Sequence, residues 1–168
     1  GVVRELRAAT GDEVAAGAIY RIAPKGFTPR VPRIDLDSTS GQIAALRSPA
    51  IHVRAAGTAR LRAQGEAAAP AVAELFGDAS DFIRARAVWV LAAQGKAGQG
   101  RVQAALADND PQMRVAAFRA LRQQNADVPG LAARLARDPS PAVRREVALS
   151  LRDVPLEKAR DILVALAQ

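Results

Sequence analysis

From residue 48 onward, apolar side chains recur at the spacing that is typical of amphipathic helices. Ile83, Ala87 and Leu91 lie four residues apart, which places them on one face of a helix. A second apolar stretch follows at Val102 and Leu106, and similar pairs of stretches fill the rest of the chain. The pattern therefore predicts pairs of helices in this part of the chain.

The helix pairs repeat with a period of 30 residues. An arginine marks each copy, with an apolar residue before it and a leucine seven residues after it. These arginines are Arg54, Arg84, Arg114 and Arg144. Aspartates keep the same step at Asp78, Asp108 and Asp138, with Ser48 in the first slot. Internal repetition of this kind is the signature of a repeat architecture, and it predicts repeats at 48–77, 78–107, 108–137 and 138–168.

Residues that favour helix ends stand at the expected places. Four positions after the leucine, the first three repeats carry Gly65, Gly95 and Asn125. These residue types tolerate the left-handed conformation that stops a helix. The segment 38–47 reads "STSGQIAALR" and predicts a half repeat of one helix, with Ser38 or Thr39 as its N-cap.

Two stretches in the repeats carry a family resemblance. "DPQMRVAAFRALRQQ" (110–124) and "DPSPAVRREVALSLRD" (138–153) resemble HEAT repeats of the short variety, about 30 residues long, first associated with phycobilisome lyases. The resemblance covers 48–168 and implies an all-α fold, an α-solenoid of stacked helix pairs behind a non-helical N-terminal lead-in. Lyase activity is not implied, because this repeat occurs in many unrelated settings.

The repeated arginines and aspartates allow two interpretations. We expect a structural ladder, in which the aspartate of the inter-repeat turn caps the next helix and accepts a hydrogen bond from the arginine on that helix. Such contacts would hold neighbouring repeats together. The alternative is a row of ligand-binding groups. A residue type that is kept in every copy favours the structural interpretation, because stacking is what every copy shares.

The first 37 residues differ from the repeats and predict a separate lead-in. "GAIYRIAPKGF" (17–27) contains a strand-like run, 18–23, and prolines follow up to Pro32. This stretch resembles the closing strand of the six-bladed propeller in sugar-dehydrogenase-like proteins. In bacterial membrane-bound dehydrogenase-like proteins, such a strand leads through a proline-rich linker into short HEAT repeats, often followed by a cytochrome c domain. The resemblance implies a periplasmic or cell-envelope parent; without it, a cytoplasmic location is expected.

The residue types in the chain argue against an enzyme. The chain has no cysteine and a single histidine, His52. Thiolate metal sites, a zinc triad of histidines and a Ser-His-Asp arrangement therefore cannot be assembled. We accordingly expect no catalytic residues, no metal and no cofactor, and we predict a non-catalytic scaffold that binds a protein partner or neighbouring domains of its parent.

The formal net charge of +7 keeps nucleic acid open as an alternative partner. The arginines that are dense between 119 and 152 could contact phosphates, although acidic residues are interspersed and aromatic residues make up only 4% of the chain. The candidate partner-binding residues on the exposed side of the second helices are Gln103, Arg134 and Arg137. Trp89 is a further candidate for a partner anchor, and the favoured alternative is that it packs against an adjoining segment. No apolar run is long enough to predict membrane insertion.

Overall fold

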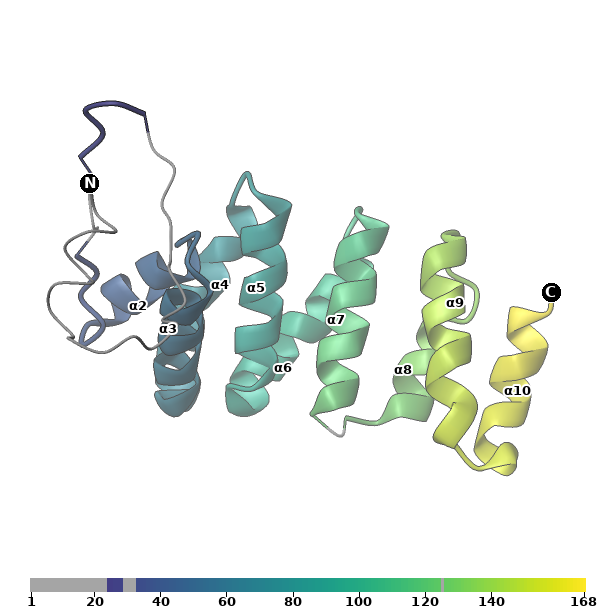
Figure 1. The fold of residues 1–168 in the computed structure, drawn as a ribbon. Coiled ribbons are helices and arrows are strands. Elements are labelled where there is room, and N and C mark those ends of the chain that lie inside the picture. Colours follow the sequence, from purple (N-terminus) through teal and green to yellow (C-terminus); the bar gives the residue numbers. More distant parts are fainter. Residues whose placement is uncertain (1–23, 29–32, 125) are drawn as a thin grey trace, which may run out of the picture. The chain divides into compact units, whose positions relative to one another are not determined.

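The computed structural model describes residues 24–28, 33–124 and 126–168. The chain divides into two compact units, Gly1–Arg33 and Ile34–Gln168, and the helices labelled in Figure 1 belong to the second. The strand-like run at 18–23 lies outside the described residues. Within the described part of the lead-in, the amide of Phe27 donates a hydrogen bond to the carbonyl of Pro24 and closes a turn (3.0 Å).

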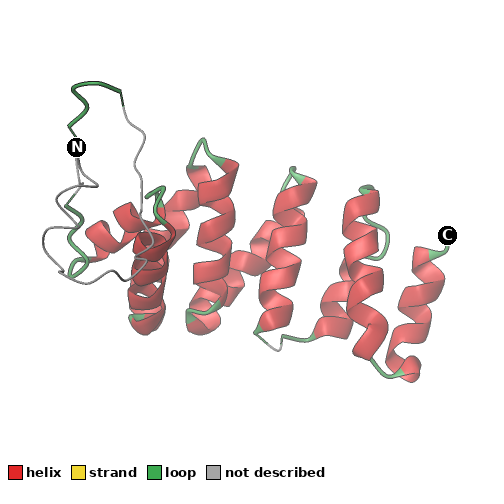
Figure 2. Cartoon of the chain, in the orientation of Figure 1, coloured by secondary structure: helices red, strands yellow, loops and turns green. Residues whose placement is uncertain are grey.

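Regular structure in the described residues is helical throughout (Figure 2). The first helices of successive pairs are α3 (Ile51–Ala63), α5 (Asp81–Ala92), α7 (Pro111–Gln123) and α9 (Pro141–Ser150). The second helices are α4 (Ala69–Ala73), α6 (Gly95–Ala104), α8 (Val128–Leu135) and α10 (Leu156–Leu166). The helix α2 (Thr39–Leu46) precedes them, and short 3-10 turns extend several of the helices.

The helices of the second unit stack as an α-solenoid. Each first helix packs against the first helix of the next pair, so that α3, α5, α7 and α9 form one row (Figure 1). The second helices pack behind them, with α4 against α6 and α8 against α10. The predicted all-α solenoid is confirmed.

The apolar stripes predicted from the sequence form the core between the two rows. Ile83, Ala87 and Leu91 are buried along α5, and Val102 of α6 meets them from the second row. Phe118 of α7 is the largest fully buried side chain among the described residues. One apolar core therefore runs through the stack, as neighbouring repeats in a solenoid require.

The helix ends follow the sequence signals. The hydroxyl of Ser38 accepts a hydrogen bond from the amide of Gly41 (3.1 Å), so Ser38 is the N-cap of α2. Gly65 and Gly95 adopt the left-handed conformation, with φ of 58° and 68°; Gly65 lies two residues after the end of α3, and Gly95 is the first residue of α6. Glycine reaches this region without the steric cost that other residues meet. Asn125 lies outside the described residues.

Candidate functional site

The turns that lead from one repeat into the next hold the repeated arginines and aspartates. Arg114, in the first turn of α7, donates from Nη1 to the carbonyls of Asp108 (2.7 Å) and Asn109 (3.2 Å). Its Nε and Nη2 donate to the two carboxylate oxygens of Asp138, at 2.8 and 2.7 Å. One guanidinium therefore joins the turn before its own helix to the turn before α9, through a bidentate, charge-assisted pair.

Asp138 is held as a carboxylate in a buried position. Its side chain keeps only 6% of its surface exposed, and its Oδ1 also accepts from the amide of Ser140 (2.8 Å). Burial by itself raises the pKa of Asp138, but the hydrogen bonds from Arg114 and from the Ser140 amide outweigh it. Together they hold the pKa of this carboxyl below its usual value of 3.8.

The capping role expected for the aspartates is wrong in detail. Ser80, Asp110 and Ser140 occupy the N-cap positions of α5, α7 and α9, two residues after the repeated aspartates. Asp78 and Asp108 have extended backbones (ψ of 141° and 147°), and their Oδ1 atoms accept a hydrogen bond from the amide of the cap residue, Ser80 or Asp110, outside the helix. These are Asx turns that orient the chain before the helix begins.

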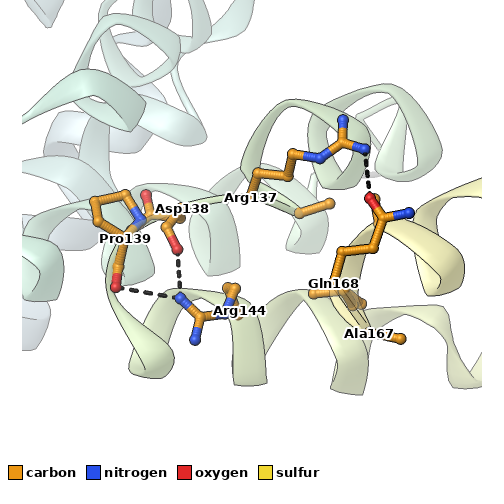
Figure 3. Close-up of a pocket in the computed structure, with 9 residues that line it drawn as sticks. Arg137, Asp138, Pro139, Arg144, Ala167 and Gln168 are labelled. Atoms are coloured by element: carbon orange, nitrogen blue, oxygen red, sulfur yellow. Dashed lines mark hydrogen bonds between the residues drawn. The ribbon is translucent and has the colours of Figure 1, made fainter.

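The pairing partner also differs from the expectation. The carboxylate of Asp138 binds the arginine of the preceding repeat. Among the described residues, Arg144 on the following helix binds the main-chain carbonyls of Asp138 and Pro139 alone, at 2.7 and 3.2 Å (Figure 3). The turn thus presents its carboxylate to one neighbour and its carbonyls to the other.

Earlier copies of the ladder use other partners. Arg84 pairs with Asp81 (2.8 Å) and more loosely with Asp110 (3.7 Å). Asp78 pairs with Arg47 instead of with a ladder arginine. Arg54 donates from Nη1 to the carbonyls of Ser48 (2.8 Å) and Pro49 (2.7 Å). The contact shared by the four arginines is therefore the one to the main chain of their own turn.

A second ion cluster joins α7 to α9, and the sequence did not single it out. Glu146 is 4% exposed and accepts from Arg119 (2.6 Å), with Arg122 at 3.5 Å. The sequence does contain one indication of this role. Glu146 follows Val143 by three residues, which puts its carboxylate on the buried side of α9. Two arginines of the basic stretch are thereby neutralised within the fold.

The candidate partner-binding residues do not form one cluster. Trp89 is partly buried and packs against the core. Gln103 is exposed on α6. Arg134 and Arg137 are exposed and line one cleft of about 570 Å³ with Arg114.

A second cleft of about 600 Å³ lies where α8 turns into α9 and α10 ends. Its walls are residues 136–139 and 165–168, with Arg144 between them (Figure 3). Arg137 donates from Nη2 to Oε1 of Gln168 at its rim (3.0 Å). Arg137 and Arg144 line this cleft beside Asp138, whose carboxylate is bound by Arg114. A guanidinium group can bind a carboxylate or another anion.

The described residues contain no group of three His, Cys, Asp or Glu side chains that could hold a metal ion. In the same part of the chain, none of the helices combines the length and apolar character needed to span a bilayer.

Comparison with known proteins identifies part of the array. Residues 98–168 match a family model described as HEAT repeats. No curated protein matches the chain. The match supports a HEAT-repeat segment in the C-terminal part of the array, and HEAT repeats generally serve as scaffolds or protein-interaction modules.

Proposed function

We propose that residues 38–168 act as a non-catalytic scaffold that binds a protein partner or neighbouring domains of a larger chain. The observation that carries this proposal is the continuous stack of helix pairs, which presents a row of second helices with exposed polar side chains. Solenoids use such extended surfaces for binding. The match of 98–168 to HEAT repeats supports the same function.

The proposal is tested by photo-crosslinking from both rows of helices. A photoreactive residue at Gln103 or Arg134 reports on the second helices, and one at Arg145 or Leu149 reports on α9 of the first row; all four positions are exposed. We expect a defined protein adduct from the second-helix positions and none from α9. Identical adducts from both rows, or none from either, would contradict the proposal.

We further propose that the scaffold belongs to a multidomain, dehydrogenase-like parent of the cell envelope. The resemblance of "GAIYRIAPKGF" (17–27) to a closing propeller strand supports this context. The gene that encodes the parent provides the test. A propeller-coding region before the repeats and a C-x-x-C-H motif after them would support the proposal, and a parent that lacks both would refute it.

Nucleic acid remains the second candidate partner, because part of the basic stretch has no acidic partner in the fold. Arg134 and Arg145 are exposed and make no ion pair within the described residues, unlike Arg119 and Arg122. Binding through phosphate contacts weakens steeply with salt. A mobility-shift titration with duplex DNA at low and physiological salt decides the point, since absence of a shift at low salt excludes this partner.

A further inference from the structure

The Arg114–Asp138 pair shows how a helix docks onto this array. Asp138 lies two residues before Ser140, the N-cap of α9, and α9 packs against both α7 and α8. The guanidinium of Arg114 binds the carboxylate of Asp138 through Nε and Nη2. An amphipathic helix that follows an aspartate is thus held by apolar packing and by one arginine fork, meaning the Nε and Nη2 donors of a single guanidinium.

Arg144 repeats this arginine with the same main-chain anchors. Its Nη1 lies 2.7 and 3.2 Å from the carbonyls of its own turn, the same distances that Arg114 shows. Its Nε and Nη2, the edge with which Arg114 binds a carboxylate, have no acceptor within the described residues. The Nε–Nη2 edge of this anchored guanidinium is therefore an open fork, and Arg144 lines the cleft (Figure 3).

The position where the period would place the missing carboxylate holds a neutral side chain. Asp138 follows Arg114 by 24 residues, and Gln168 follows Arg144 by the same 24. Oε1 of Gln168 accepts from Arg137 and makes no bond to Arg144. No described residue therefore supplies a carboxylate to the Nε and Nη2 of Arg144.

The surface next to the fork has the apolar character that a helix requires. Ala165, Leu166 and Ala167 line the cleft, and the neighbouring Leu163 and Val164 are 42% and 53% exposed. In the preceding repeat, the corresponding second helix α8 is packed against α9. Apolar side chains beside an open arginine fork match an amphipathic partner in both packing and charge.

We infer that the cleft between residues 136–139 and 165–168 is a docking site for an amphipathic helix of a protein partner. The helix carries an aspartate in the turn before it, and Arg144 binds that carboxylate. This inference rests on the proposed scaffold function and names the chemistry of the partner.

The test uses a stapled helical peptide of residues 138–153, added to the ¹⁵N-labelled full chain. A staple between positions 145 and 149, both on the exposed side of α9, removes the entropic cost of forming the helix. The matched control peptide has asparagine in place of its Asp138. We expect shifts of the Arg144 Nε–Hε signal and of the 165–168 amides, with binding about tenfold weaker for the control, because a charge-assisted pair is lost.

Two variants of the chain locate the binding site. Arg144→Gln removes the fork, and Arg145→Gln removes the adjacent exposed charge while leaving the fork intact. We expect about tenfold weaker binding to the first and unchanged binding to the second. If Arg144→Gln fails to fold, as circular dichroism would show, the comparison of the two peptides on the native chain still decides.

Equal affinities for the two peptides, or no binding at all, would overturn the inference. Shifts confined to Gln103 and Arg134 would overturn it as well, while leaving the scaffold proposal in place. Duplex DNA that shifts the Arg144 signal and displaces the peptide would reassign the cleft to nucleic acid.

Discussion

At the scale of single residues, Arg114 connects two repeats through one side chain. Its guanidinium binds main-chain carbonyls of one turn and the carboxylate of the next. Because Asp138 is almost fully buried, removal of its partner leaves a carboxylate without water to solvate it. The stabilising effect of the pair is therefore best measured as the cost of removing one member.

Arg114→Ala should lower the free energy of unfolding by about 2 kcal/mol, which lowers Tm by about 5 °C in a chain of this size. The matched change Arg144→Ala should cost less than about 1 kcal/mol, because Arg144 holds only carbonyls. Thermal and urea unfolding measure both. Unchanged melting of Arg114→Ala together with lost partner binding would assign the arginine a ligand role instead.

Asp138 should also make stability depend on pH. Its pKa lies below 3.8 in the folded chain, so around this pH the unfolded chain binds more protons than the folded one. Its contribution is therefore complete above about pH 5 and is lost as the pH falls through the lowered pKa. Asp138→Asn removes this titration.

Urea unfolding of the native chain and Asp138→Asn, from about pH 7 down to about pH 3, tests this dependence. The difference in unfolding free energy should be largest at the upper end and should shrink towards the acid end. A difference that stays constant with pH would show that Asp138 is not the titrating group.

At the scale of helices, α5 and α6 approach closely at a glycine. A Cβ at Gly98 would run into the carbonyl oxygen of Leu91 and would lie 3.0 Å from Cβ of Gln94. Gly100, two residues later in α6, faces open space. The same helix thus offers one glycine that packing requires and one that packing does not.

Gly98→Ala should destabilise the chain by about 1–3 kcal/mol, because the two helices must move apart. Gly100→Ala should stabilise it by about 0.5–1 kcal/mol, because alanine favours the helical backbone. Urea unfolding of the two variants gives the comparison. Equal effects of both changes would mean that helix propensity alone governs these positions.

Sequence periodicity predicted the helices well, because each repeat restates the same apolar stripe and the same end signal. The stripe of Ile83, Ala87 and Leu91 and the turn at Gly95 could be assigned without coordinates. The close approach at Gly98 could not, because it depends on the distance between two helix axes.

The ladder was predictable as a set of residue types, and its pairing was not. Arg114 could reach the aspartate before its own helix or the one before the next helix, and only the stagger of the stacked turns selects Asp138. Glu146 was missed for a related reason. A carboxylate amid arginines appears as part of a mixed charged surface until the fold places it against α7.

At the scale of the whole molecule, each helix pair contacts chiefly its neighbours, so a local change should spread along the stack only step by step. Phe118 lies in the middle of the array and Ile162 lies in the last helix. Truncation of these two side chains should therefore destabilise different lengths of the stack.

Phe118→Ala should cost about 3–5 kcal/mol and accelerate amide hydrogen exchange on both sides of α7. Ile162→Ala should accelerate exchange mainly in α10 and in α8 and α9, against which α10 packs. Exchange measured by mass spectrometry separates these patterns. Uniform loss of protection in both variants would show a single cooperative unit.

The turn at Asp138, which contacts an arginine on each side, fixes the number of residues by which the array can be lengthened or shortened. Its carbonyl binds the arginine that follows by six residues, and its carboxylate binds the arginine that precedes by 24, and these offsets add up to one period. Deleting residues 108–137 would bring Asp138 to the same offset from Arg84. A deletion between Arg84 and Asp138 that is not 30 residues long would place a different residue at this offset, so the length of this part of the array can change only by a whole period.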